Sequence, residues 1–228
     1  MALIVIEGLD GAGKSTQIRL LAEYLNGRGI KNEYLHFPRM DAPFFGEMIA
    51  RFLRGEMGDV SQVDPYVVAL LYACDRMDAS KMIQEWLANG KTVILDRYVY
   101  SNVGFQCAKL ADETEQDRLR KWIIDLEYDY YKIPYPDLNL FLDVPFQFTK
   151  ERLTEIRKGD DREYLKGKED IHEKDLAFQE KVRQIYLRQE QVDPNFKIVK
   201  CYNNDYSIKK PEEIYSLIVD RVEGVLNR

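Results

Sequence analysis

The sequence predicts an α/β fold in which a five-stranded, mainly parallel sheet is covered by helices on both faces. Short apolar runs alternate with long helical stretches along the 228 residues, and strands separated by helices favour right-handed crossovers and parallel pairing. Glycines, a proline and acidic residues follow the apolar runs. In a parallel sheet these residues gather at the carboxyl edge, where such folds bind their ligands.

Five short apolar runs are the predicted strands. The first, residues 2–6 (ALIVI), is too brief for a helix and is soon followed by Gly8, which is typical of a strand buried on both faces. The others are residues 33–37, 92–95, 138–142 and 196–200. The second run ends before Pro38, the third before Asp96 and the fourth before Asp143, so turn-forming and acidic residues mark the carboxyl ends of the strands.

Helical stretches separate these strands. In the first, Ile18, Leu21 and Leu25 recur at helical spacing and Gly27 ends the run, as glycines often do at the C-terminus of a helix. Further helices are predicted over residues 64–89, 113–131, 147–157, 172–191 and 211–226.

Composition and charge exclude several classes of protein. With 33 basic and 39 acidic residues the net charge is −6, which does not favour binding to nucleic acid or to an anionic membrane through bulk charge. The cysteines, Cys74, Cys107 and Cys201, are odd in number and widely spaced, so no disulfide framework is expected. The sequence shows neither a leader nor a long apolar segment, so we expect a cytoplasmic protein. Together with the net charge, this predicts neither nucleic acid nor a membrane as a partner.

The chain shows no internal repeat and no linker rich in Pro, Gly or Ser. Its length suits a single large domain. The one change in composition lies at residues 157–175, which are almost wholly polar and carry many charges of both signs. We therefore expect one domain over residues 1–228, with a polar lid at about residues 157–175.

A phosphate-binding loop is the strongest motif. Gly8 to Ser15 match G-x-x-x-x-G-K-[ST] at every fixed position, after a predicted strand and before a predicted helix. Its backbone N–H groups and the helix N-terminus suit phosphate oxygens, while Lys14 suits the β and γ phosphates and Ser15 a Mg²⁺ ion. The predicted ATP-binding residues are Gly8, Asp10, Gly11, Ala12, Gly13, Lys14, Ser15 and Thr16.

This motif indicates the P-loop NTPase fold. A glycine-rich turn that binds nothing is the alternative, but the flanking elements agree with the motif. A guanine-selecting N-K-x-D is absent from the sequence, which argues against a switch GTPase. A small phosphotransferase fits better.

Five segments together resemble the thymidylate kinase family, in order and at similar spacing over nearly the whole chain. They are IEGLDGAGKSTQ at 6–17, FPR at 37–39, LLYACDR at 70–76, LDRYVYSNVGFQ at 95–106 and PDLNLFLDV at 136–144. The resemblance implies transfer of the γ-phosphoryl group of ATP to dTMP, with Mg²⁺ as cofactor and a homodimer as the assembly.

The resemblance also implies an acceptor site, and the chemistry of the residues suits it. Tyr72 and Arg76 are four residues apart and share one helical face, so a ring could stack on a pyrimidine while a guanidinium donates to its carbonyl groups. Arg39 would bind the monophosphate through two parallel hydrogen bonds from its planar guanidinium. The full predicted substrate-binding set is Asp10, Phe37, Arg39, Tyr72, Arg76, Arg97, Ser101, Phe105 and Gln106.

Two of these residues would recognise the sugar. By the resemblance, the ring of Phe105 near C2′ excludes a ribose hydroxyl, and Asp10 accepts a hydrogen bond from the 3′-hydroxyl. A purely structural role is the alternative for several members of the set: Tyr72 as a core aromatic and Arg39 as an exposed arginine.

Catalysis would need no protein nucleophile, because the acceptor phosphate is already an anionic nucleophile and the protein has only to align two anions and neutralise charge. Asp96 and Ser15 are the predicted metal residues, although Asp96 as a helix cap is the alternative. Some family members carry an arginine at the position of Gly11, and others supply one from the lid. The predicted catalytic set is Lys14, Asp96, Arg97, Arg157 and Arg162.

Thymidylate kinase activity is thus the leading hypothesis. Another nucleoside monophosphate kinase or a deoxynucleoside kinase would share the fold and differ in the acceptor. A non-catalytic ATP-binding regulatory protein would lack a second anion site. Because Arg39, Arg76 and Arg97 are expected at one edge of the sheet, the sequence favours two phosphorylated ligands.

Overall fold

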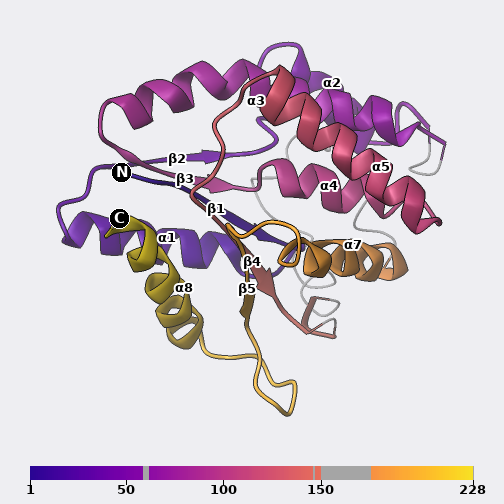
Figure 1. Ribbon diagram of the computed structural model, residues 1–228. Coiled ribbons are helices and arrows are strands. Elements are labelled where there is room, and N and C mark those ends of the chain that lie inside the picture. Colours follow the sequence, from indigo (N-terminus) through magenta and orange to yellow (C-terminus); the bar gives the residue numbers. More distant parts are fainter. Residues whose placement is uncertain (59–61, 146, 150–175, 228) are drawn as a thin grey trace.

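Five parallel strands form one sheet in the computed structural model, which describes residues 1–58, 62–145, 147–149 and 176–227 (Figure 1). Within these residues the strand order is β2-β3-β1-β4-β5, and every neighbouring pair is parallel. The strands are β1 (Leu3–Gly8), β2 (Asn32–His36), β3 (Thr92–Asp96), β4 (Leu138–Asp143) and β5 (Phe196–Lys200). The predicted five-stranded parallel sheet is confirmed.

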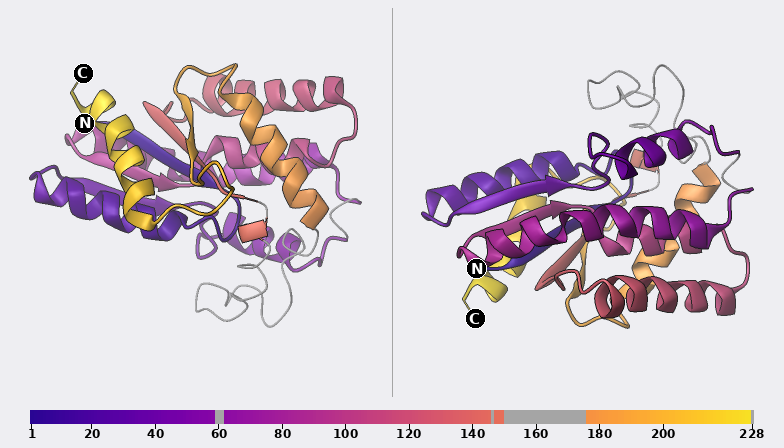
Figure 2. Two further views of the ribbon diagram at one scale, coloured as in Figure 1. Left: turned by 90° about the horizontal axis from the view of Figure 1, so that it is seen from below. Right: turned by 90° about the horizontal axis from the view of Figure 1, so that it is seen from above.

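Helices cover both faces of the sheet (Figures 1 and 2). One face packs against α1 (Lys14–Gly27) and α8 (Pro211–Leu226). The other packs against α3 (Pro65–Ala88), α4 (Val99–Cys107), α5 (Glu113–Ile124) and α7 (Leu176–Gln189). A shorter helix, α2 (Phe45–Leu53), packs on α3, and α5 continues into a π-helical segment, η1 (Asp125–Tyr130). No described helix is long and apolar enough to span a membrane.

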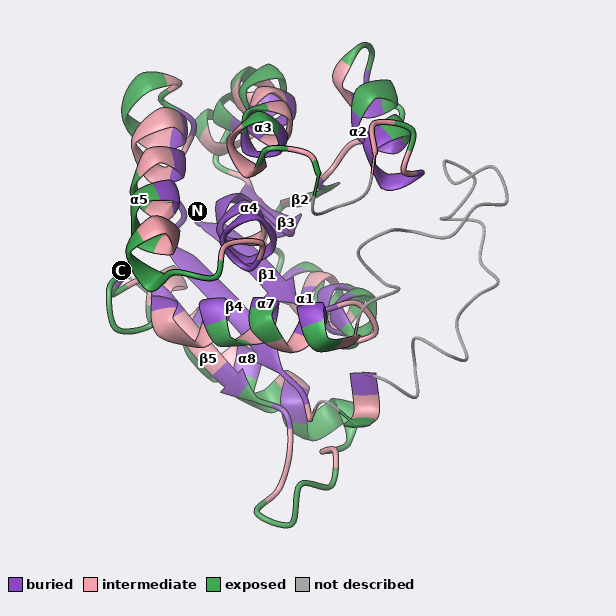
Figure 3. Ribbon diagram, turned by 90° about the vertical axis from the view of Figure 1, so that its right-hand side faces the viewer, coloured by how far each residue is buried: buried purple, intermediate pink, exposed green. Residues whose placement is uncertain are grey.

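Strands β1, β3, β4 and β5 contribute side chains to two hydrophobic cores, one on each face of the sheet. Leu3 and Val5 of β1 belong to the core beneath α3, α4, α5 and α7, whereas Ile4 and Ile6 belong to the core beneath α1 and α8. Successive side chains on a strand point to opposite faces, so a strand with apolar residues at every position is covered on both sides. Figure 3 shows β1, β3 and β4 buried between the helices.

Two helices were not among those predicted from the sequence. The segment of α4 reads VYSNVGFQC, with β-branched and aromatic residues and Gly104 in its interior, and these residues have poor helix propensity. Eight of its nine residues are buried, so tertiary packing stabilises this helix. The other helix, α2, is only nine residues long, and a periodic pattern is weak over so short a segment.

The predicted polar lid at residues 157–175, with Arg157 and Arg162, lies outside the described residues, as does the predicted helix 147–157 beyond residue 149. The strand order brings the other motifs together. Ile6 of β1 pairs with Asp96 of β3, and Gly8 pairs with Leu142 of β4. The phosphate loop therefore starts at the centre of the sheet, directly beside the carboxyl end of β3.

Candidate functional site

One large cavity, of about 1220 Å³, lies at the carboxyl edge of the sheet. Its walls come from the loop after β1, the segment after β2, helices α3 and α4, and the start of α8. The predicted residues that line it are Asp10, Gly11, Ala12, Gly13, Lys14, Ser15, Thr16, Phe37, Arg39, Tyr72, Arg76, Asp96, Arg97, Ser101, Phe105 and Gln106. Residues far apart in the sequence therefore share one cavity.

The phosphate loop has the backbone that its glycines predict. Gly11 and Gly13 have φ angles of 77° and 85°, in the left-handed region that side chains disfavour. Lys14 folds back over the loop, and its Nζ lies 3.3 Å from the carbonyl oxygen of Gly8 and 3.2 Å from that of Leu9. Burial and the nearby Arg97 charge lower the pKa of Lys14, while Asp96 opposes this shift.

Asp96 is the acid at the carboxyl end of β3. It is buried, and its Oδ2 lies 3.2 Å from Nδ1 of His36. Its other oxygen, Oδ1, has no hydrogen-bond partner among the described residues. Burial by itself would raise the pKa of Asp96, but Lys14, His36 and Arg97 hold it below its ordinary value. The carboxylate is therefore ionised and has one oxygen available.

Arg97 follows directly and adopts a left-handed backbone, with φ of 67°. Its Nη2 donates to Oδ1 of Asp10 at 2.6 Å and its Nη1 to Oγ of Ser101 at 3.3 Å, while its guanidinium carbon lies 5.4 Å from the centre of the Phe105 ring. Although burial disfavours a charge here, the Asp10 carboxylate above all raises the pKa of Arg97. The guanidinium stays charged and is fixed next to the phosphate loop.

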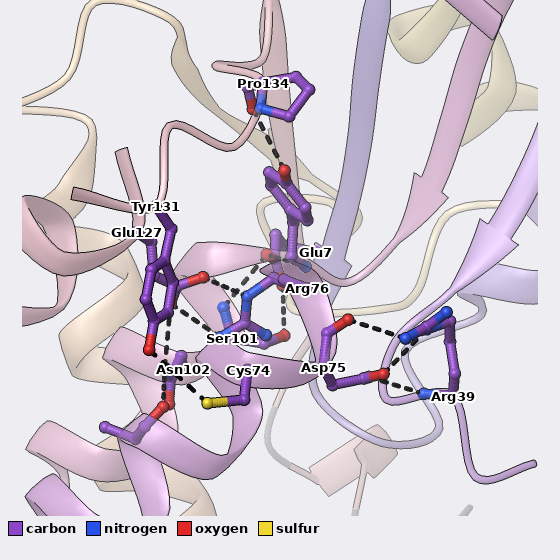
Figure 4. Close-up of polar contacts among 12 residues, drawn as sticks. Glu7, Arg39, Cys74, Asp75, Arg76, Ser101, Asn102, Glu127, Tyr131 and Pro134 are labelled. Atoms are coloured by element: carbon purple, nitrogen blue, oxygen red, sulfur yellow. Dashed lines mark hydrogen bonds and ion pairs between the residues drawn. The ribbon is translucent and has the colours of Figure 1, made fainter. Parts of the chain in front are cut away.

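Two carboxylates of α3, Asp75 and Asp78, hold Arg39, and Figure 4 shows the first of them. Its Nε and its backbone N–H donate to the two oxygens of Asp75, at 2.8 and 2.9 Å, and its Nη2 also pairs with Asp78. The loop carrying Arg39 lies against α2, where a Cβ at Gly46 would be only 2.5 Å from the Arg39 carbonyl oxygen. Helix α3 thus fixes the guanidinium of Arg39, and helix α2 packs against its main chain.

Arg76 forms the most deeply buried ion pair of the cavity wall. Its Nε and Nη2 donate to the two oxygens of Glu127, the second at 2.8 Å, and the two side chains are 2% and 0% exposed (Figure 4). Its Nη1 has no hydrogen-bond partner among the described residues. Because a bidentate pair fixes the plane of a guanidinium, the direction of this third nitrogen is set.

Sequence analysis did not identify Asn102, which lies on α4 in the same cavity wall. Its Nδ2 donates to the carbonyl oxygen of Ala69 at 3.0 Å and to Oε1 of Glu127 at 3.1 Å, the oxygen that Arg76 also binds. Its Oδ1 is buried and has no partner among the described residues, like Oε1 of Gln106. The signal in the sequence was an amide between apolar and aromatic residues in VYSNVGFQC, since a buried amide needs a hydrogen-bond partner.

Sequence analysis also missed the acids that hold Arg39 and Arg76. Asp75 lies within LLYACDR, but Glu127 comes from η1, 51 residues beyond Arg76. No spacing in the sequence relates these two positions. The cavity thus combines a phosphate loop, a buried acid with an available oxygen, and three guanidiniums held by carboxylates, an arrangement that can bind two anionic ligands.

Comparisons with known proteins agree with this chemistry. A family model described as "Thymidylate kinase" matches residues 6–210. The chain is 35% identical to a probable thymidylate kinase of Thermococcus kodakarensis, covering 98% of each chain, and 31% identical to thymidylate kinase of Arabidopsis thaliana, covering 97% of this chain and 72% of the relative. A solved structure of thymidylate kinase from Candida albicans is similar, with a TM-score of 0.73, 28% identity, and coverage of 98% and 91%.

Substitution Glu127→Leu tests the buried pair. It leaves the Arg76 guanidinium buried without its counter-charge, so we expect the free energy of unfolding to fall by about 3–5 kcal/mol, measured by urea denaturation. As a control, Glu23→Leu breaks an exposed pair with Arg19 on α1, and we expect a much smaller change. Equal losses in the two variants would contradict the importance of the buried pair.

Proposed function

The chain belongs to the thymidylate kinase family, and on this basis we propose how its cavity transfers a phosphoryl group from ATP to dTMP. The enzyme is a nucleoside monophosphate kinase with a P-loop NTPase fold. The proposal assigns each end of the cavity to one nucleotide. The observation that carries it is that Arg76 and Asn102 bind the same oxygen of Glu127 through Nη2 and Nδ2, while Oδ1 of Asn102 and Nη1 of Arg76 have no hydrogen-bond partner among the described residues.

We assign the phosphates of ATP to the loop from Gly8 to Thr16. Gly11 and Gly13 have the left-handed backbone that lets a loop direct N–H groups at phosphate oxygens. Helix α1 begins at Lys14, so the N-terminal end of a helix adds positive potential. Lys14 supplies the point charge for the β and γ phosphates.

We assign the base of dTMP to the wall formed by Tyr72, Arg76 and Asn102. Thymine offers a donor at N3 and an acceptor at O4, which match the Asn102 oxygen and the Arg76 Nη1. Cytosine offers an acceptor at N3 and a donor at its exocyclic amine, so both contacts would be mismatched. Tyr72 would stack on the ring, and Gln106 and Phe37 would complete this part of the site.

The sugar and phosphate of dTMP come next to the phosphate loop. Arg39 and Arg97 would bind the monophosphate, Asp10 the 3′-hydroxyl, and Phe105 would pack near C2′. Ser101 lies within hydrogen-bond distance of Arg97. The predicted roles of Arg157 and Arg162 in neutralising the transferring group stay predictions, since these residues lie outside the described part of the chain.

No general base is needed for this transfer. An oxygen of the dTMP phosphate, already anionic at neutral pH, forms the new bond to the γ-phosphorus as the bond to ADP breaks. What the protein supplies is alignment and positive charge. Lys14, Arg39 and Arg97 provide this charge from fixed positions, so little reorganisation is required as charge develops.

We also propose that Mg²⁺ accompanies ATP and is held by Ser15 and Asp96. The available Oδ1 of Asp96 fits this role, because Mg²⁺ prefers oxygen ligands and is usually held by few protein groups plus water and phosphate. When bound, the ion would neutralise phosphate charge.

Substitution Asp96→Asn tests the metal assignment. We expect the Mg²⁺ concentration for half-maximal activity to rise about tenfold or more, since a neutral amide binds the ion less well. Mn²⁺ binding to the enzyme with nucleotide, followed by electron paramagnetic resonance, gives a readout independent of turnover. Unchanged metal affinity in both measurements would reject Asp96 as a metal residue.

The acceptor assignment is tested by measuring phosphate transfer from ATP to dTMP, dUMP, dCMP and dGMP. We expect kcat/KM to be highest for dTMP, and Asn102→Leu to lower it by about tenfold to hundredfold for dTMP with the KM for ATP unchanged. The preference for dTMP over dCMP should shrink in this variant. Transfer to another acceptor in preference to dTMP would reject the base assignment, and no transfer at all would favour a binding protein.

The oligomeric state, the domain organisation and the cellular location of the enzyme are further proposals. We propose a homodimer packed through helices, supported by Val67, Leu70 and Met77, which are 61%, 40% and 37% exposed on α3. One chain has a mass of 26.8 kDa, and light scattering should then give twice this value.

We also propose that residues 1–228 form one P-loop kinase domain, which a single calorimetric transition would support. A cytoplasmic location is proposed as well; the three free cysteines support it, and cell fractionation tests it.

A further inference from the structure

We infer that the buried Glu7 carboxylate positions Arg97 for phosphoryl transfer, and that the hydroxyl group of Tyr186 on α7 is part of the same hydrogen-bond network. Neither residue touches the nucleotides in the assignment above, so both are positioning residues. The inference rests on the proposed function, because it needs Arg97 to act on the transferring phosphate.

Glu7 provides the N-terminal cap of α4. It lies in β1, directly before the phosphate loop, and is 0% exposed. Its Oε1 accepts hydrogen bonds from the backbone N–H groups of Tyr98 and Ser101, at 2.9 and 3.1 Å. Tyr98, the N-cap residue of α4, makes no side-chain cap of its own. A carboxylate from a neighbouring strand therefore satisfies the free N–H groups at the start of the helix.

The second oxygen of Glu7 binds the hydroxyl of Ser101 (Figure 4), and Nη1 of Arg97 lies within hydrogen-bond distance of the same hydroxyl. Oε2 of Glu7 lies 2.6 Å from Oγ of Ser101 and 2.9 Å from the hydroxyl of Tyr186. Burial raises the pKa of Glu7, while hydrogen bonds from Ser101 and Tyr186 and the charge of Arg97 oppose this shift. The Ser101 hydroxyl donates to Oε2 of Glu7. The lone pairs of Ser101 Oγ are then free to accept from Nη1 of Arg97, 3.3 Å away.

Arg97 needs such support because its backbone is strained. A left-handed φ is unfavourable for a residue with a side chain and persists only where the surroundings fix it. The backbone N–H of Arg97 donates to the carbonyl oxygen of Ile6 at 3.0 Å, the residue before Glu7. Thus β1 holds the main chain of Arg97, and through Glu7 and Ser101 it also orients the side chain.

Tyr186 is fixed tightly enough to take part. Its ring stacks on Phe141 with centroids 4.4 Å apart and an interplanar angle of 13°. The other side meets Gly104 of α4, where a Cβ would lie 2.8 Å from the ring. This close approach, which only glycine allows, brings the Tyr186 hydroxyl to Glu7 and to within 2.8 Å of Ser101 Oγ.

Helix α4 also offers a matched control. Tyr100 donates from its hydroxyl to the buried Asp193 at 2.7 Å, and its ring packs on Phe196. This is again a buried tyrosine bound to a buried carboxylate. Unlike Tyr186 and Glu7, however, neither residue has a hydrogen bond to Ser101 or Arg97 among the described residues. A purely structural role predicts the same consequence for both tyrosines, whereas a positioning role affects only Tyr186.

The experiment compares Tyr186→Phe with Tyr100→Phe by steady-state kinetics and thermal unfolding, each alone and with Arg97→Ala. We expect Tyr186→Phe to lower kcat about fivefold with both KM values within about twofold, and Tyr100→Phe to leave kcat unchanged, although both lower the unfolding temperature. In the Arg97→Ala background Tyr186→Phe should have no further effect on kcat, because its action passes through Arg97.

Three outcomes would overturn the inference. The first is an equal kcat in Tyr186→Phe and Tyr100→Phe. The second is that Tyr186→Phe lowers kcat by the same factor in the Arg97→Ala background as in the unaltered enzyme. A normal kcat in Arg97→Ala would reject the proposed role of Arg97 and this inference with it, so the two failures can be told apart. If Tyr186→Phe does not fold, Glu7→Gln against Asp193→Asn makes the same comparison, since each exchanges a buried carboxylate for an amide.

Discussion

The site depends on pairing each of its arginines with a carboxylate before any ligand binds. Lys14, Arg39, Arg76 and Arg97 line one cavity, and the three arginines are held by Asp75 and Asp78, by Glu127, and by Asp10. Guanidiniums gathered without counter-charges would repel one another and lose hydration on burial. The carboxylates offset both costs and fix the direction of the remaining N–H groups.

This pairing also explains why the cavity wall is built from helices with polar residues in their interiors. Asn102 and Glu127 lie on α4 and η1 within a mostly apolar layer, and each is buried. Polar groups in such surroundings are stable only when their hydrogen bonds are satisfied. The acceptor left open on Asn102 and the oxygen left open on Asp96 therefore stand out as places where a ligand would complete the network.

Rigid support reaches the site from outside the cavity. Glu7 caps α4 from β1, Tyr186 reaches the same carboxylate from α7, and Gly46 lets α2 lie against the loop that carries Arg39. These contacts hold the groups of the site in place from the sheet and from three helices. Such preorganisation suits phosphoryl transfer, in which the protein contributes mainly position and charge.

The sequence by itself determined the strands, the long helices and the phosphate loop, because apolar periodicity and glycine conformation are local properties. It also brought Asp96 and Arg97 to the loop, since strand ends in a parallel sheet share one edge. Only the tertiary structure decided that α4 is a helix, that Arg76 pairs with Glu127, and that Asn102 keeps a free acceptor in the cavity. These features depend on contacts between residues far apart in the chain. Such contacts are stabilised by burial and by the pairing of charges, and neither produces a periodic pattern in the sequence.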